Sequence, residues 1–130
     1  FIHENILLIN ADIITEIVLE DFFDFHQKSN ADLTIATRYF TQNIPYAVIN
    51  EKNKTPISIN EKPDLQFKIN AGIYLFKKKL IDQIPSETFY DATDFINDIM
   101  RSDKIVKTYN FQQKWVDIGS KKELNMMNNE

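Results

Sequence analysis

Apolar and polar residues follow one another along the chain in blocks that predict strands and helices in mixed order. The continuous apolar run Asn5 to Ile9 stops at the polar residues Asn10-Ala11-Asp12 and is typical of a buried strand. From Val18 the apolar residues recur at helical spacing, and Ser29-Asn30 is a suitable stop. The β-branched run Leu33 to Thr37 predicts the next strand. Strand, helix and strand in this order indicate a βαβ unit.

The rest of the chain continues the mixed pattern. Two short strands, Tyr46 to Asn50 and Ile57 to Asn60, are predicted as a pair, and a long strand follows from Phe67 to Phe76, in which Gly72 marks a bulge or a close backbone approach. The clearest helix spans residues 91–100, with Asp91 placed to cap its N-terminus. Short strands at 105–109 and 115–117 and a capping box at 120–123 complete the set. We predict one α/β domain, residues 1–130, with a mixed sheet flanked by helices.

Composition narrows the class of protein. The 130 residues include 10 Phe and 5 Tyr, which is more apolar surface than a disordered chain carries. There is no Cys, which excludes a disulfide scaffold, a Cys-based zinc site and a thiol nucleophile. A net charge of −4 argues against wrapping nucleic acid, and no apolar run approaches the roughly 18 residues of a membrane span. We therefore expect a cytoplasmic protein with neither a nucleic-acid nor a membrane partner. The 2 glycines leave no Gly-rich phosphate loop in this chain.

Two acidic residues follow predicted strands. Asp12 lies just past the carboxyl end of the first strand, where open α/β sheets bind ligands, and Asp117 ends the strand that begins at Trp115. Taken alone, Asp12 fits a turn or a helix cap equally well. As a pair, two carboxylates at strand ends are what a magnesium–phosphate site needs, with water and phosphates as the remaining ligands.

The Glu61-Lys62-Pro63 segment is a second candidate. Pro63 restricts Lys62 toward an extended backbone, which would place the side chains of Glu61 and Lys62 on opposite sides. Lys62 can then offer charge to a phosphate while Glu61 accepts hydrogen bonds from a sugar hydroxyl; a solvated surface pair is the competing interpretation. His26 is interpreted as a satisfied helix histidine, and Lys77-Lys78-Lys79 as a solvated helix start.

Four separated motifs occur in a fixed order along nearly the whole chain. They are Leu8-Ile9-Asn10-Ala11-Asp12-Ile13, Pro45-Tyr46-Ala47-Val48, Glu61-Lys62-Pro63 with Ile69-Asn70-Ala71-Gly72-Ile73-Tyr74, and Trp115-Val116-Asp117-Ile118-Gly119. In this order the motifs resemble the sugar-phosphate nucleotidyltransferases, the family of mannose-1-phosphate guanylyltransferase and glucose-1-phosphate thymidylyltransferase. The resemblance implies a Rossmann-like, GT-A-like fold. It also implies a reaction in which a nucleoside triphosphate (NTP) and a sugar 1-phosphate give a nucleotide sugar and pyrophosphate.

The resemblance also implies roles for single residues. Asp12 and Asp117 would bind Mg²⁺, and together with Lys62 they would form the catalytic set. Glu61 would contact sugar hydroxyls and Lys62 the sugar phosphate. The residues implied to line the substrate pocket are Tyr46, Ala47, Asn70, Ala71 and Gly72. Because the attacking sugar phosphate is already an anion, the reaction needs no general base.

The chain departs from the family pattern in two respects. The family's N-terminal Gly-rich signature, whose Arg and Lys hold the triphosphate, does not occur in these residues. We therefore expect the C-terminal part of a catalytic domain, without its leading βαβ portion and inactive by itself. Ala11 and Ala47 stand where the family usually has Gly, and a methyl group there could crowd a ligand or forbid a positive φ.

The departures leave alternatives open. One is a non-catalytic relative that binds a sugar nucleotide or regulates a partner. A glycosyltransferase of similar fold is disfavoured by the motifs at Glu61 and Trp115. An apolar sheet edge left exposed would predict association with a second copy of the chain or poor solubility.

Overall fold

The protein is described by a computed structural model that covers residues 4–84 and 91–119. The chain divides into two compact units. The core unit comprises residues 1–37 and 70–130, and the hairpin unit comprises Arg38–Ile69. The single domain over residues 1–130 stays a prediction.

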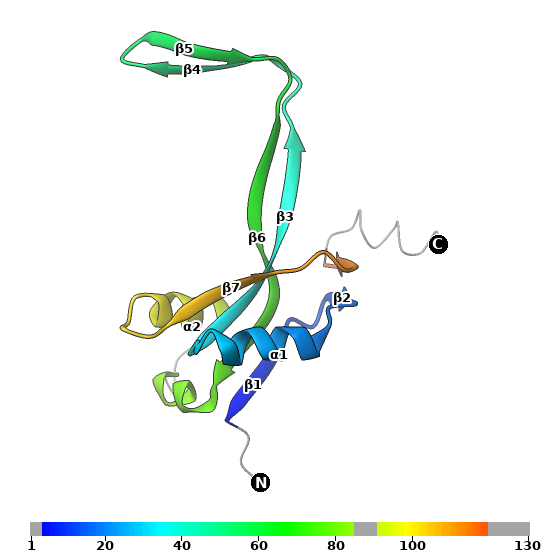
Figure 1. Ribbon diagram of the computed structural model, residues 1–130, viewed down its shortest axis with the longest axis vertical. Coiled ribbons are helices and arrows are strands. Elements are labelled where there is room, and N and C mark those ends of the chain that lie inside the picture. The colour runs from blue at the N-terminus through cyan, green and yellow to red at the C-terminus, as the bar shows by residue number, and fades with distance from the viewer. Residues whose placement is uncertain (1–3, 85–90, 120–130) are drawn as a thin grey trace. The chain divides into compact units, whose positions relative to one another are not determined.

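The core unit is built on a four-stranded sheet with the strand order β1-β6-β3-β7 (Figure 1). β1 (Asn5–Ile9) runs antiparallel to β6 (Asp64–Lys77), and β3 (Leu33–Asn43) runs parallel to β7 (Val106–Asn110). The predicted mixed sheet is therefore confirmed. The prediction that β1 is buried is wrong: Ile9 is 40% exposed, because β1 lies at the edge of the sheet that the described strands form.

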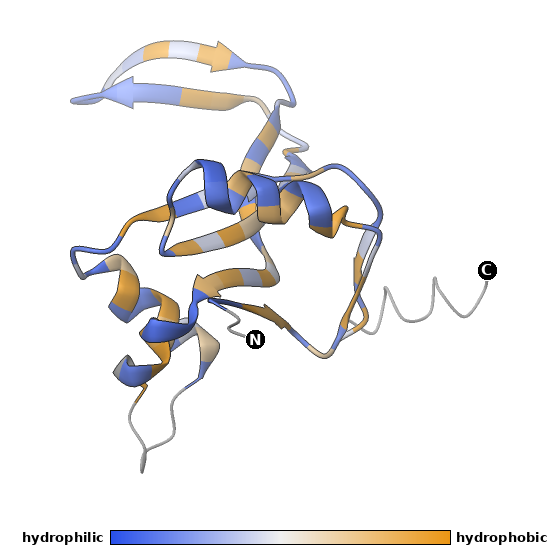
Figure 2. Ribbon diagram, turned by 60° about the horizontal axis from the view of Figure 1, so that its bottom comes forward, coloured by the Kyte–Doolittle hydropathy of each residue, from blue (hydrophilic) through white to orange (hydrophobic). Residues whose placement is uncertain are grey.

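Two helices accompany the sheet, and both carry apolar and polar residues (Figure 2). α1 (Leu19–Lys28) buries Phe22 and His26, as its periodicity predicts. α2 (Ala92–Met100) begins where the sequence places its cap, since an Asp91 carboxylate oxygen accepts a hydrogen bond of 2.9 Å from the Asp94 N–H. No helix within residues 4–84 and 91–119 combines the length and the apolar character needed to cross a bilayer.

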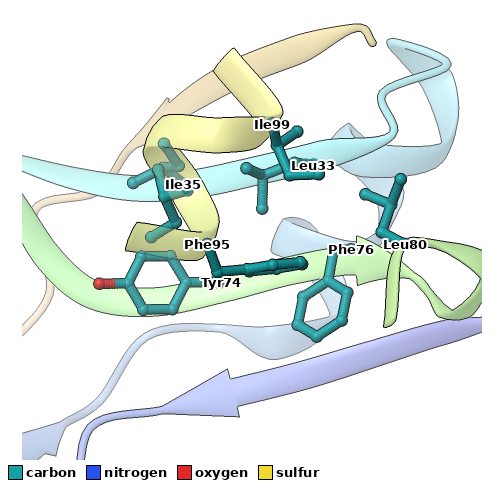
Figure 3. Close-up of a cluster of buried hydrophobic side chains, with 8 residues drawn as sticks. Leu33, Ile35, Tyr74, Phe76, Leu80, Phe95 and Ile99 are labelled. Carbon is teal, nitrogen blue, oxygen red and sulfur yellow. The ribbon is translucent and has the colours of Figure 1, made fainter. Parts of the chain in front are cut away.

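Side chains of β6 alternate between two buried clusters, because successive strand residues point to opposite faces of a sheet. One cluster packs α2 against the sheet, as Figure 3 shows; its buried members are Leu33, Ile35, Tyr74, Phe76, Leu80, Phe95, Ile96 and Ile99. The other packs α1 on the opposite face; its buried members are Phe22, Ala36, Ala71, Ile73, Leu75 and Phe111. The core unit thus has three layers, with the sheet between the two helices.

Shorter elements complete the core unit. β2 (Ile13–Thr15) pairs antiparallel with β8 (Trp115–Asp117), and a 3₁₀ helix η1 (Lys78–Gln83) follows β6. The lysine run therefore ends a strand and opens a 3₁₀ helix. The capping box predicted at 120–123 lies outside the described residues.

The hairpin unit contains β4 (Val48–Lys52) and β5 (Thr55–Asn60), paired antiparallel. This confirms the predicted strand pair, with bounds shifted by the turn at residues 53–54. The predicted extended backbone of Lys62 is wrong, since its φ is +42°. Lys62 lies in the turn between β5 and β6, where its carbonyl accepts a hydrogen bond of 3.3 Å from Asn43 Nδ2. The turn geometry outweighs the preference that Pro63 imposes on the preceding residue.

Candidate metal and substrate site

The two candidate acids, Asp12 and Asp117, come together in the core unit. Asp12 ends the turn after β1, and Asp117 ends β8. β2 and β8 hold them in register, because Ile13 pairs with Asp117 and the Ile118 N–H donates to the Asp12 carbonyl at 2.8 Å. Asp12 is exposed and Asp117 half-buried. Within residues 4–84 and 91–119, neither carboxylate forms an ion pair with a Lys or Arg side chain.

Gly119 marks the point on which both carboxylates converge. A Cβ atom placed on Gly119 would lie 2.6 Å from Asp12 Oδ2 and 3.0 Å from Asp117 Oδ1. The Gly119 N–H also donates to Asp117 Oδ1 at 2.9 Å, which fixes the orientation of that carboxylate. The space beside Gly119 is therefore bordered by two carboxylate oxygens and filled by no side chain of its own.

This donor set fits a magnesium ion. Mg²⁺ prefers oxygen ligands and is usually held by one or two carboxylates, while water and phosphate oxygens complete its coordination. The described residues contain no group of three or more His, Cys, Asp and Glu side chains that could enclose a metal. Two carboxylates at an exposed position suit a metal shared with a phosphate-bearing ligand better than a structural metal.

The Asn70-Ala71-Gly72 segment lies beside the Asp12 turn. The Asn10 N–H donates to the Gly72 carbonyl at 2.9 Å, and a Cβ on Gly72 would lie 2.7 Å from Asn10 Nδ2. Gly72 has a φ of +75°, which is unfavourable for residues with a side chain. Gly72 thus permits the predicted close approach of two backbone segments. Asn10 lies beside the site; it belongs to the first sequence motif, but the sequence assigned it no role.

Trp115 connects the same segment to β8. Its indole Nε1–H donates to the Ala71 carbonyl at 2.8 Å, across 44 residues of sequence. Trp115 also packs at the edge of the α1 cluster. The hydrogen bond gives it a second role, because it ties the strand that ends in Asp117 to the predicted substrate segment.

The other predicted substrate residues belong to the hairpin unit. Tyr46, Ala47, Glu61 and Lys62 are all exposed, and Tyr46 has 74% of its surface accessible. The core unit therefore contains Asp12, Asp117 and residues 70–72, while these four residues lie within residues 38–69.

The alanines that replace family glycines are accommodated by the backbone. The described residues with positive φ other than glycine are Asn30, Asn53, Lys54 and Lys62. Neither Ala11 nor Ala47 is among them, so neither methyl group is forced into a left-handed conformation.

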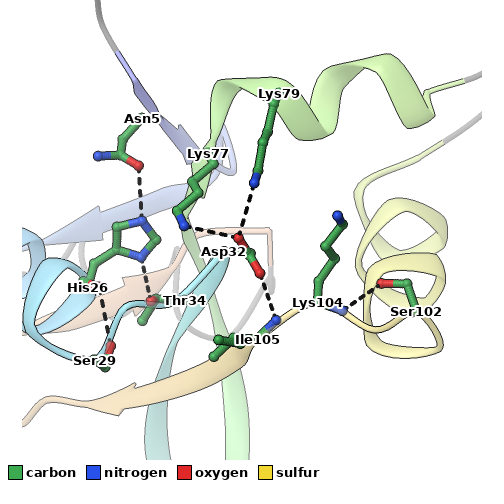
Figure 4. Close-up of polar contacts among 10 residues, drawn as sticks. All are labelled: Asn5, His26, Ser29, Asp32, Thr34, Lys77, Lys79, Ser102, Lys104 and Ile105. Atoms are coloured by element: carbon green, nitrogen blue, oxygen red, sulfur yellow. Dashed lines mark hydrogen bonds and ion pairs between the residues drawn. The ribbon is translucent and has the colours of Figure 1, made fainter.

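A second polar cluster lies at the opposite end of the β1–β6 pair (Figure 4). Here the buried His26 contacts Thr34 Oγ1 through Nδ1 at 2.7 Å and Asn5 Oδ1 through Nε2 at 3.1 Å. Because an amide oxygen only accepts, Nε2 carries the proton and Nδ1 accepts from Thr34. The sequence-based interpretation of His26 as a satisfied histidine is confirmed. Burial lowers the pKa of His26, and the nearby Lys77 lowers it further.

Asp32 is the charged centre of this cluster. Its carboxylate pairs with the Lys77 ammonium at 3.1 Å and the Lys79 ammonium at 3.9 Å, and accepts from the Ile105 N–H at 2.8 Å. Burial alone would raise the pKa of Asp32, but the Ile105 hydrogen bond and the two lysines together lower it below its usual value. The lysine run does open a helix, and Lys78 and Lys79 are exposed, as the interpretation of a solvated helix start expects. That interpretation did not include the ion pairs of Lys77 and Lys79 with Asp32.

We call residues Asn5, His26, Asp32, Thr34, Lys77 and Lys79 the lysine end. We call residues Asn10, Asp12, Gly72, Asp117 and Gly119 the carboxylate end. A cavity of about 760 Å³ adjoins the lysine end, and its lining includes both lysines and acids. Asp12 and Asp117 are not among the residues that line this cavity, and they have no cationic protein partner among the described residues.

Solved structures share this fold. The crystal structure of HddC from Yersinia pseudotuberculosis superposes with a TM-score of 0.67 at 22% identity, and the match covers 95% of this chain and 54% of that one. The four-stranded mixed sheet with its two helices is accordingly a Rossmann-like α/β fold.

Sequence comparison identifies the family. The model of the nucleotidyl transferase family matches residues 2–130. The chain therefore belongs to the nucleotidyl transferase family, among the sugar-phosphate nucleotidyltransferases, as its motifs predicted.

Two named relatives illustrate the similarity. The mannose-1-phosphate guanylyltransferase catalytic subunit beta of Dictyostelium discoideum is 28% identical over 125 residues, which are 92% of this chain and 34% of the relative. The UTP–glucose-1-phosphate uridylyltransferase of Synechocystis sp. is 28% identical over 127 residues, covering 92% and 33% respectively. The chain thus spans about a third of the length of these relatives.

Proposed function

We propose that this chain supplies the sugar-binding and metal-binding part of an enzyme that forms a nucleotide sugar and pyrophosphate from an NTP and a sugar 1-phosphate. The observation that carries the proposal is the convergence of Asp12 and Asp117 on the open space beside Gly119. The names of the relatives support it, since they describe guanylyl and uridylyl transfer to mannose 1-phosphate and glucose 1-phosphate.

Asp12 and Asp117 would hold Mg²⁺ through Oδ2 and a carboxylate oxygen respectively. Bound there, the ion would offset the negative charge that gathers when two phosphate groups approach one another. The hydrogen bond from the Gly119 N–H to Oδ1 would restrain the orientation of the Asp117 carboxylate. Backbone contacts between β2 and β8 would position both carboxylates before a ligand binds.

The substrates would react by direct displacement. An oxygen of the sugar phosphate forms a bond to the α-phosphorus of the NTP, and the bond from that phosphorus to the pyrophosphate oxygen breaks, so pyrophosphate leaves. In this proposal Lys62 holds the sugar phosphate and Glu61 accepts hydrogen bonds from the sugar hydroxyls. The segments at Tyr46-Ala47 and Asn70-Ala71-Gly72 line the sugar pocket. No proton needs to be removed from the nucleophile.

Metal binding can be tested on the full chain by NMR. Mn²⁺, a paramagnetic substitute for Mg²⁺, should broaden the amide signals of Asp12, Asp117 and Gly119 before those of the rest of the chain. Asp12→Asn and Asp117→Asn should each remove this selective broadening. Asp24→Asn is the matched control, because Asp24 is an exposed helix acid that pairs with Lys28. Broadening that survives both site substitutions would refute the metal site.

Catalysis should be tested on the complete product of the gene that encodes this chain. We expect release of pyrophosphate that needs an NTP, a sugar 1-phosphate and Mg²⁺ and that is lost in Asp12→Asn. The alternative function is a non-catalytic relative that binds a sugar nucleotide, suggested by Ala11 and Ala47. Binding of a sugar nucleotide without any turnover would establish that alternative.

A further inference from the structure

The Tyr74 hydroxyl has a partner at the proposed substrate segment. Tyr74 is 2% exposed and belongs to the cluster that packs α2 against the sheet. Its ring is therefore fixed by the core, whereas its hydroxyl reaches Asn70 Nδ2 at 2.9 Å. Asn70 itself is exposed. A residue of the core thus holds the side chain of a residue at the surface.

The Asn70 amide is used at both ends. While Nδ2 donates to the Tyr74 hydroxyl, Oδ1 accepts from the Gly72 N–H at 2.9 Å. An amide rotated by 180° would place Nδ2 against the Gly72 N–H and would lose that hydrogen bond. The Gly72 N–H therefore selects one orientation of the Asn70 side chain. The Tyr74 hydroxyl, which can donate or accept, restrains the Nδ2 end of that amide. In this orientation one Nδ2 hydrogen has no partner among residues 4–84 and 91–119 and can donate to a ligand.

The same contacts continue toward the metal site. Gly72 accepts from the Asn10 N–H through its carbonyl at 2.9 Å, and Asn10 opens the turn that ends at Asp12. The positive φ of Gly72 allows its N–H to face Asn70 and its carbonyl to face Asn10. The order of contact is thus Tyr74, Asn70, Gly72 and Asn10, all within the core unit.

We propose that Tyr74 is a positioning residue for sugar recognition: its hydroxyl orients the Asn70 amide so that the free Nδ2 hydrogen can donate to a sugar oxygen. This inference rests on the proposed function, because it assigns Asn70 to the sugar pocket. Tyr74 does not touch the substrate and acts only through Asn70. Loss of its hydroxyl should weaken sugar 1-phosphate binding by roughly 2- to 10-fold, the value of one neutral hydrogen bond.

The test is a double-mutant cycle in the full chain with Tyr74→Phe and Asn70→Ala. Two quantities are measured by NMR in each variant: hydrogen exchange of the Gly72 amide without ligand, and the Kd for glucose 1-phosphate or mannose 1-phosphate in the presence of Mg²⁺. Tyr74→Phe should speed Gly72 exchange and raise the Kd. In the Asn70→Ala background, the same substitution should change neither quantity. Tyr109→Phe, a tyrosine in the α1 cluster, is the matched control and should change neither.

The outcomes separate the two proposals. If Tyr74→Phe leaves the Kd unchanged, or if it raises the Kd equally in the Asn70→Ala background, the positioning role is overturned. If the unaltered chain and the complete gene product both fail to bind either sugar 1-phosphate, the proposed function fails and the positioning role falls with it. In that case, faster hydrogen exchange of the Gly72 amide in Tyr74→Phe would show that the hydrogen bond between Tyr74 and Asn70 has only a structural role.

Discussion

At the lysine end of the β1–β6 pair, protein partners hold a carboxylate, two ammonium groups and an imidazole. At the carboxylate end, two carboxylates face one point, and no cationic side chain of the described residues pairs with them. The two ends are joined by the same strands, at the Asn5–Lys77 and Ile9–Ile73 pairs. Polar groups that satisfy one another stabilise a fold, while like charges left side by side are available for a ligand. For this reason we propose the carboxylate end, whose charges are not neutralised by the described residues, as the place of the chemistry.

The two ends also differ in the kind of residue that forms them. Charged and hydroxyl side chains build the lysine end, but the carboxylate end depends equally on missing side chains. Both glycines of the chain, Gly72 and Gly119, lie there, each against another residue's polar side chain. Substitutions should therefore act oppositely at the two ends: removing atoms damages the first, and adding atoms damages the second.

The largest effect on stability is expected from Asp32→Ala. The substitution leaves Lys77 and the Ile105 N–H without their carboxylate partner, and we expect the free energy of unfolding to fall by about 1.5–3 kcal/mol. Urea denaturation measures the change. Asp12→Ala is the control at the other end and should change stability by less than about 0.5 kcal/mol, because Asp12 is exposed. Equal losses in both variants would contradict the distinction between the two ends.

Gly72→Ala should have the next largest effect on stability. The left-handed φ of +75° alone costs a residue with a Cβ about 1–2 kcal/mol, and the methyl group would meet Asn10 Nδ2 at 2.7 Å. We expect lower stability in urea denaturation and displaced NMR signals for Asn10 and Asp12. Ala71→Gly, at the preceding buried position, removes a methyl group instead and serves as the control that leaves Asn10 in place. An unshifted Asn10 signal in Gly72→Ala would argue against the close contact.

Gly119→Ala should affect ligand binding more than folding. Its Cβ would lie 2.6 Å from Asp12 Oδ2, so both carboxylates must move apart, and we expect Mn²⁺ affinity to fall on the order of 10-fold. Isothermal titration calorimetry measures the affinity. Lys114→Ala, an exposed neighbour in the same segment, should bind Mn²⁺ as the unaltered chain does. Unchanged affinity in Gly119→Ala would mean that the carboxylates do not share one ion.

The smallest effect is a pH dependence at the lysine end. The pKa of His26 is below its ordinary value of 6.5 in the folded chain, so unfolded chains bind more protons between these two values. Stability is then fully present above about pH 6.5 and declines as the pH falls toward the folded-state pKa. Urea denaturation at several pH values should show this decline, and His26→Gln should flatten it. A decline of the same size in His26→Gln would assign it to other groups.

The sequence predicts local elements better than long-range contacts. The α2 helix and its Asp91 cap follow from periodicity and one side chain, and both are confirmed. The burial of β1 depends on which strands lie beside it, and nothing in an apolar run tells an edge strand from a central one. Lys62 shows the same limit, since the turn around it is set by contacts from Asn43, which is 19 residues away.

The candidate site shows the same difference between local patterns and long-range contacts. The sequence motifs contain Asp12, Asp117 and Gly119, but only the pairing of β2 with β8 brings them to one point. The motifs also contain Trp115 and Asn10. The hydrogen bond from the Trp115 indole to the Ala71 carbonyl could not be predicted, because no periodic pattern relates these two positions. The pairing of Lys77 with Asp32 was missed for the same reason, because a lysine run without its partner resembles any solvated segment.

The hairpin unit leaves β3 after Thr37 and returns through β6 at Asn70, and these two strands are already neighbours in the sheet. Residues 38–69 are thus an excursion between adjacent strands, which a tight turn of a few residues could replace. A gene shortened in this way should still encode the three layers and the convergent carboxylates. In such a shortened chain, metal binding by the core unit could be measured without the side chains of residues 38–69.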